Sequence, residues 1–177
     1  MGDASVVSER SRADALACIA WSHIWSPVVP DPLREKAWRA LGLPGSIASH
    51  DTEFWSTFQL GAVTPKVSLL LHAALKREGG AVRDDWMRVT RHLGLRFDGV
   101  HLPPDQLGVA CEVFACAVER EESVLIEELR RRYLLPWCDL AKKALDGGSS
   151  RLTFLPARFE ADLLALRAHT ARGACAD

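Results

Sequence analysis

The chain has 177 residues, of which 48% are hydrophobic and 25% are charged, so it is long enough to bury a core of its own as a single domain spanning residues 1–177. A net charge of −1 excludes the strong basic excess that nucleic-acid-binding domains usually carry. The longest apolar run, residues 67–75, is much shorter than the roughly 20 residues that span a bilayer, and the amino terminus has no apolar stretch typical of a secretory signal.

Five cysteines occur at positions that offer no C-x-x-C pair: Cys18, Cys111, Cys116, Cys138 and Cys175. Their odd number and irregular spacing favour reduced, buried thiols and a cytoplasmic location over a disulfide framework. The six histidines are scattered, without the spacing of a zinc site. We therefore expect no metal, and no motif indicates a bound cofactor.

Helical periodicity dominates the chain. In residues 8–25 the inward face is predicted to contain Ala13, Leu16, Ala17, Ala20, Trp21, Ile24 and Trp25. Proline and glycine signals divide the rest of the chain. The predicted helices cover residues 8–25, 32–41, 51–60, 64–77, 81–93, 105–119, 123–132, 137–145 and 156–172. No alternating apolar pattern flanks a hairpin turn, so the predicted fold is all-α, a single compact bundle of about eight or nine helices.

Two local signals carry specific expectations. Thr64-Pro65 is a cap followed by a proline and predicts the start of the helix over 64–77. Pro136 lacks the N–H that a continuous helix would need, so we expect the backbone to bend there. The glycine- and serine-rich residues 146–150 form a flexible connector, which is compatible with a monomer or a domain-swapped dimer.

The helix that follows Leu102-Pro103-Pro104 is apolar around most of its circumference, which predicts a central position. Asp105 is predicted to cap it, and Asp105 and Glu112 share a polar strip with Gly108 between them. Two interpretations stand side by side. The strip is a solvated edge of a core helix, or Gly108 leaves a slot between two acids that accepts the backbone or a basic side chain of a peptide.

A second group of residues is Tyr133-Leu134-Leu135-Pro136-Trp137. Core packing around a bend accounts for Leu134 and Trp137, whereas the Tyr133 hydroxyl is expected at a polar edge. No nucleophile motif and no paired catalytic carboxylates are present, so no catalytic residue is predicted.

Pro103-Pro104-Asp105-Gln106-Leu107-Gly108 and Tyr133-Leu134-Leu135-Pro136-Trp137 resemble, in order and spacing, the signature of the TorD/DmsD/NarJ family of redox-enzyme maturation chaperones. Pro65-Lys66-Val67-Ser68-Leu69-Leu70 is similar to the family's earlier helix start. The resemblance covers roughly residues 60–170. Three positions depart from the pattern: Gln106 and Tyr133 stand where histidine is common, and Lys66 stands where several members carry tryptophan.

The resemblance implies an all-helical, TorD-like cytoplasmic chaperone, not an enzyme, for the assembly of a molybdopterin-containing oxidoreductase. Such a protein binds the twin-arginine signal peptide, or the apo catalytic subunit, until the cofactor is inserted. The implied peptide-binding residues are Asp105, Gln106, Gly108, Glu112, Tyr133, Pro136, Trp137, Lys66 and Ser68. The alternative is a helical ligand-sensing or adaptor module of a regulator.

Overall fold

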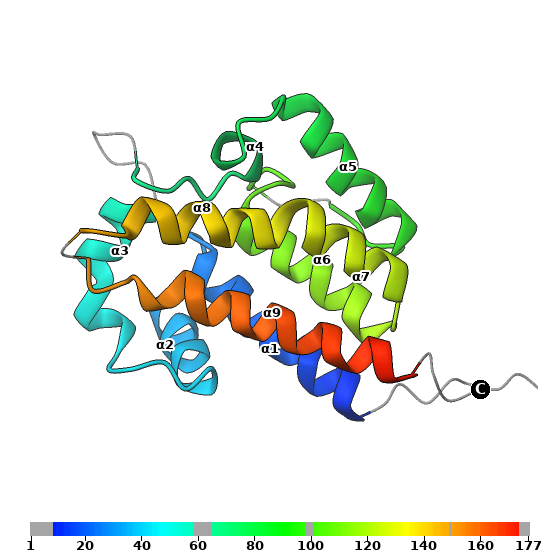
Figure 1. Cartoon of the computed structure of the whole chain (residues 1–177), viewed down its shortest axis with the longest axis horizontal. Helices are drawn as coiled ribbons and strands as arrows, with labels where there is room; N and C mark the ends of the chain where they lie inside the picture. Colours follow the sequence, from blue (N-terminus) through cyan, green and yellow to red (C-terminus); the bar gives the residue numbers. More distant parts are fainter. Residues whose placement is uncertain (1–8, 59–64, 98–100, 149, 174–177) are drawn as a thin grey trace, which may run out of the picture.

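The computed structural model describes residues 9–58, 65–97, 101–148 and 150–173, with the side chains of 167–173 excepted (Figure 1). In this part of the chain the elements are α1 (Glu9–Trp25), α2 (Asp31–Ala40), the 3-10 helix η1 (Ile47–His50), α3 (Asp51–Phe58), α4 (Leu71–Ala74), α5 (Gly79–His92), α6 (Leu107–Glu119), α7 (Ser123–Leu129), the π-helix η2 (Arg130–Leu134), α8 (Leu135–Leu145) and α9 (Phe154–Gly173). The predicted all-α bundle of about eight or nine helices is confirmed.

Helix α6 is the central element. Ten of its 13 residues are buried, as its apolar sequence predicts. Helix α1 packs along it, and α9 runs antiparallel beside α1, so that the beginning of α1 and the end of α9 lie at the same end of the molecule (Figure 1). Helix α5 lies on the opposite side of the bundle. The amino-terminal and carboxy-terminal helices therefore form one face together.

An aromatic cluster joins four helices at the centre of the core. Trp25 of α1 is fully buried, and five other rings surround it. Their centroid distances from Trp25 are 5.6 Å for Trp21, 6.0 Å for Phe54, 5.4 Å for Phe58, 5.2 Å for Trp137 and 5.9 Å for Phe159. Offset-stacked and edge-to-face pairs at these separations contribute beyond the area they bury. This cluster fixes α1, α3, α8 and α9 relative to one another.

The predicted helix over 64–77 is wrong within its described part. Residues 65–70 are not helical, and helix α4 contains only Leu71–Ala74. Leu70 forms an isolated antiparallel bridge with Gln106, in which Leu107 N donates to Leu69 O at 2.8 Å and Leu71 N donates to Asp105 O at 2.9 Å. Pairing with a distant segment has replaced the local helical hydrogen bonds that the sequence pattern favours, and Thr64 itself lies outside the described residues.

The gap between the predicted helices over 123–132 and 137–145 is also wrong, because residues 133–136 are helical too. Residues 123–145 form one uninterrupted helical stretch in which η2 supplies a wide turn. Leu135 N donates to Arg130 O, five residues back, as a π-turn requires. Pro136 then falls in the first turn of α8, directly after the wide turn. The extra residue in the turn accommodates the proline without a break.

The inward face of α1 is rotated slightly from the prediction. Leu16 is 62% exposed, whereas Cys18 and Ser22 are buried. Ser22 satisfies its hydroxyl by donating to Ile19 O at 2.7 Å. A small polar side chain that bonds its own helix can thus take an inward position where α1 meets α6 closely.

Candidate functional site

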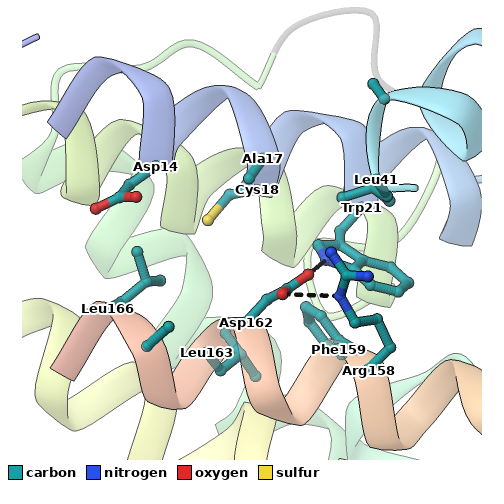
Figure 2. Close-up of a pocket in the computed structure, with 12 residues that line it drawn as sticks. Asp14, Ala17, Cys18, Trp21, Leu41, Arg158, Phe159, Asp162, Leu163 and Leu166 are labelled. Carbon is teal, nitrogen blue, oxygen red and sulfur yellow. Dashed lines mark hydrogen bonds and ion pairs between the residues drawn. The ribbon is translucent and has the colours of Figure 1, made fainter. Parts of the chain in front are cut away.

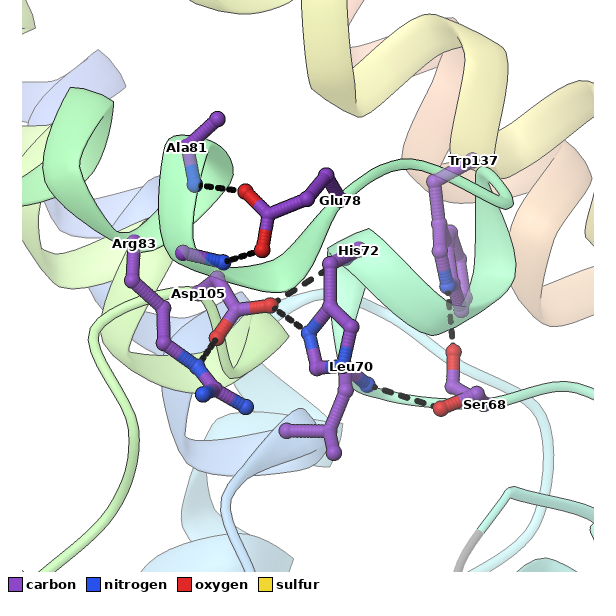
Figure 3. Close-up of polar contacts among 9 residues, drawn as sticks. Ser68, Leu70, His72, Glu78, Ala81, Arg83, Asp105 and Trp137 are labelled. Atoms are coloured by element: carbon purple, nitrogen blue, oxygen red, sulfur yellow. Dashed lines mark hydrogen bonds and ion pairs between the residues drawn. The ribbon is translucent and has the colours of Figure 1, made fainter.

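Asp105 is completely buried and holds together two segments that are far apart in the sequence (Figure 3). Its Oδ2 accepts from His72 N at 3.1 Å and lies 2.5 Å from His72 Nδ1, while its Oδ1 accepts from Arg83 Nε at 3.3 Å. The predicted cap of α6 is wrong, because Gln106 takes that position and accepts from Val109 N at 3.1 Å. Asp105 instead binds a free backbone N–H at the start of α4.

The two side chains that contact Asp105, those of His72 and Arg83, reach solvent while the carboxylate does not. The Arg83 side chain is 44% exposed and the His72 side chain is 20% exposed. A bound peptide at this surface would therefore meet the guanidinium and the imidazole, and the carboxylate lies beneath them. The role that these contacts support for Asp105 is to hold the residues that precede α6 against α4 and α5.

Gly108 is a packing position between α6 and α1. A Cβ at this residue would lie 2.9 Å from Ser22 O and 2.9 Å from Ser26 Cβ, closer than side chains approach. Gln106 locks the same contact, because its Nε2 donates to Trp25 O at 2.7 Å. Helix α1 therefore fills the space above Gly108 that the sequence interpretation left open as a slot between two acids.

Ser68 and Trp137 are brought together by the extended segment 65–70. Trp137 Nε1 donates to Ser68 O at 2.9 Å, and Ser68 Oγ accepts from Leu70 N at 3.1 Å (Figure 3). Ser68 is half-buried, whereas Lys66 on the same segment is exposed. The indole thus anchors this segment to α8 and the aromatic cluster.

An apolar groove lies between segment 65–70 and the residues that precede α6. We name it the proline groove; it has a volume of about 200 Å³ and is lined by Pro27, Phe58, Pro65, Ser68, Leu69, Leu70, Leu102, Pro103 and Gln106. Two of the predicted site residues, Ser68 and Gln106, lie in this lining. Three prolines contribute rings without N–H groups, which leaves a surface suited to apolar side chains.

Tyr133 lies elsewhere, between α5 and η2. Its ring is buried, and its hydroxyl donates to Asp85, which also accepts from Arg132 Nη2 at 2.8 Å. Burial, together with Asp85, raises the pKa of Tyr133 to about 12. Although burial alone would raise the pKa of Asp85, the hydrogen bonds from Tyr133 and Arg88 hold that pKa below its ordinary value. Tyr133 is therefore a neutral hydroxyl that is bonded within the protein.

The interaction of Asp85 with Tyr133 predicts an acid-sensitive contribution to stability. A carboxyl group whose pKa is lower in the folded chain than its ordinary value of 3.8 stabilises the fold above that pH and loses the contribution as the pH falls through the folded pKa. We expect the free energy of unfolding, measured by urea titration between pH 7 and pH 3, to fall less steeply on acidification in Asp85→Asn than in the wild type. Asp84→Asn, at the exposed neighbour, is the control and should retain the wild-type slope. Equal slopes in all three proteins would contradict the prediction.

The other two predicted residues remain apart from the proline groove. Glu112 is exposed on α6. The protein atoms around its carboxylate partly remove it from water, which raises the pKa of Glu112, and the nearby His23 opposes that shift. Pro136 is half-buried in the first turn of α8. The structure thus gathers Ser68, Asp105, Gln106, Gly108 and Trp137 around one junction, with Lys66 on its exposed side, and leaves Glu112, Tyr133 and Pro136 outside it.

Sequence reasoning missed three residues that bind predicted site residues: His72 and Arg83, which bind Asp105, and Asp85, which binds Tyr133. Each belongs to a pair whose members lie 22 to 48 residues apart, so no local spacing identifies them. The sequence offers one signal for these residues: His72 is a polar residue within the apolar run 67–75. That signal does not reveal the partner.

Within the described part of the chain, no group of three or more His, Cys, Asp or Glu side chains could hold a metal ion. No helix there is long and apolar enough to cross a membrane. Comparisons of the chain with protein-family models, curated proteins and solved structures found no match.

Proposed function

We propose that this protein is a chaperone for the assembly of a molybdopterin-containing oxidoreductase and binds the twin-arginine signal peptide of that enzyme, or its apo catalytic subunit. The single observation that carries the proposal is the pairing of Leu70 with Gln106. It places side by side two of the segments that carry the family resemblance, 65–70 and 103–108. Together these segments line an apolar groove.

The chemistry of a twin-arginine leader supports this assignment. Such a peptide has a cationic start followed by an apolar stretch, and the proline groove suits the apolar part. Burying one leucine-sized side chain contributes about 1.5–3 kcal/mol. The half-buried Ser68 adds a polar group to an otherwise apolar lining, which is a usual arrangement in binding sites.

The charged part of the leader needs carboxylates that reach solvent. Asp105 is enclosed by His72 and Arg83, so Glu112 on α6 is the better placed of the two predicted acids to attract it. Attraction between opposite charges at an exposed site chiefly raises the association rate. We assign the proposed protein a binding role and no catalytic residue.

The proposal predicts that a charge introduced into the proline groove weakens leader binding. Leu102 lines the groove and is half-buried, so Leu102→Asp should place a carboxylate against the apolar part of the peptide and weaken binding at least tenfold. Calorimetric titration with synthetic twin-arginine leader peptides of the molybdenum oxidoreductases encoded in the same genome measures this. Val124→Asp makes the same change at a side chain that is 78% exposed on α7 and should bind as the wild type does.

Two results would contradict the proposal. In the first, none of the leader peptides binds the wild-type protein. In the second, Leu102→Asp binds as tightly as Val124→Asp while circular dichroism shows both to be folded.

A further inference from the structure

A second groove lies between α1 and α9, on the face that the amino-terminal and carboxy-terminal helices form (Figure 2). Its volume is about 180 Å³. The floor is apolar and includes Cys18 and Trp21 of α1 with Leu163 and Leu166 of α9, and the edges carry Asp14, Arg158 and Asp162. We name it the α1/α9 groove.

The charges along this groove do not balance. Asp162 is fully engaged, because its Oδ2 accepts from Trp21 Nε1 at 2.8 Å and its Oδ1 accepts from Arg158 Nε at 3.0 Å. Asp14 is half-buried and makes no hydrogen bond or ion pair with any residue that the structure describes. Arg158 and Asp162 cancel each other, so the groove presents one uncompensated carboxylate.

The thiol at the floor adds no competing charge. Burial, followed by the nearby carboxylates Asp14 and Asp162, raises the pKa of Cys18 to about 12. The thiol is therefore neutral at physiological pH and counts as part of the apolar floor. Among the described residues that line the groove, Asp14 is the one whose charge is not cancelled by a neighbour.

The dimensions of the groove restrict its occupant to one side chain. A volume of about 180 Å³ is close to that of an apolar cavity of about 150 Å³ known to hold a benzene-sized molecule. An apolar floor with one carboxylate at its edge matches a side chain with a methylene stem and a cationic tip. Arginine and lysine have this form.

We propose that the α1/α9 groove binds an arginine or lysine side chain of a partner polypeptide, with Asp14 pairing with the cationic tip and the apolar floor receiving the stem. This site is separate from the proline groove and does not require the partner to be a leader peptide. The two grooves flank one aromatic cluster. Trp21 lines the first and Phe58 the second, and their ring centroids lie 5.6 Å and 5.4 Å from that of Trp25.

The test uses the full-length protein and the short peptide acetyl-Leu-Arg-Leu-amide, with acetyl-Leu-citrulline-Leu-amide as the uncharged match. Two-dimensional ¹H–¹⁵N NMR resolves the indole N–H of Trp21, assigned with Trp21→Phe, which reports directly on the groove through its hydrogen bond to Asp162. We expect the arginine peptide to shift this resonance in a saturable manner and the citrulline peptide to bind about tenfold more weakly. Asp14→Asn should weaken binding of the arginine peptide about tenfold, since it removes the charge. Asp84→Asn removes the same charge from an exposed position on α5 and should leave binding unchanged.

Four outcomes would overturn the proposal. The Trp21 resonance does not respond to millimolar arginine peptide, or it responds equally to the citrulline peptide, or Asp14→Asn binds as the wild type does. A chemical shift of the Trp21 indole that changes with protein concentration and not with peptide concentration would identify a second copy of the chain as the occupant. That result would overturn the proposal too. Because the probe is not a leader, failure here is distinguishable from failure of leader binding in the proline groove.

Discussion

Replacing Trp25 with alanine is expected to lower the free energy of unfolding by about 3–5 kcal/mol, the range for removing a large aromatic side chain from a core. Trp25 is fully buried and touches rings from α1, α3, α8 and α9. Alanine would leave a cavity at the point where these helices meet. Urea unfolding followed by far-ultraviolet circular dichroism measures the effect.

The matched controls separate ring packing from hydrogen bonding. Within the described part of the chain, Trp25 Nε1 has no hydrogen-bond partner. Trp25→Phe therefore keeps an aromatic ring and removes an unpaired donor, so it should cost much less than Trp25→Ala. Trp137→Phe, in contrast, also loses the bond from Nε1 to Ser68 O. A Trp25→Phe variant as unstable as Trp25→Ala would contradict this account of the cluster.

Replacing Asp105 with asparagine is expected to lower the free energy of unfolding by about 2–3 kcal/mol, as loss of charge-assisted hydrogen bonds at a buried group implies. The carboxylate accepts from the His72 backbone and imidazole through one oxygen and from Arg83 through the other. An asparagine side chain has only one oxygen, so its NH₂ group must face a donor on one of the two sides. The same unfolding titration measures the change.

Arg83→Ala is the control for the Asp105 prediction. Its side chain is 44% exposed, so solvent screens the pair and its removal should cost less than about 1 kcal/mol. An Asp105→Asn protein as stable as the wild type would show that the buried carboxylate does not hold the two segments together. Any change in leader affinity on substitution of Asp105 must accordingly be compared with the loss of stability, because the carboxylate contacts α4 and α5 and does not line the groove.

The helices were largely predictable because their signals are local. Apolar periodicity and proline or glycine signals place most helix ends within a few residues of those observed. The segment 65–70 was not predictable, since Thr64-Pro65 has the form of a helix start. The hydrogen bonds that keep the segment extended come from residues distant in sequence, namely 105–107, Thr57 and Trp137. The wide turn before Pro136 was missed for a related reason: a proline predicts the loss of one hydrogen bond, and it does not show how the neighbouring turn adjusts.

The candidate site was predictable in its residues more than in their roles. Ser68 and Gln106 do share a groove, yet their proximity depends on a pairing across 36 residues of chain. Aspartate often caps helices, and Asp105 does accept from a backbone N–H at the start of a helix. That helix is α4, whereas the sequence predicted α6. Gly108 looks like a gap in a polar strip, and only the position of α1 shows that the gap is filled.

The wide turn of η2 absorbs one residue without changing the direction in which the next helix faces. Leu135 N donates to Arg130 O, five residues back, so Leu135 stands where the fourth residue would stand in an ordinary turn. Deleting a single amino acid between Arg130 and Leu134 would restore ordinary winding and keep Trp137 and Cys138, both now completely buried, directed at the interior. The same deletion would place Pro136 inside an ordinary helix, where its ring and its missing N–H disrupt the hydrogen-bond ladder. The fifth residue of the turn therefore serves the proline and not the facing of α8.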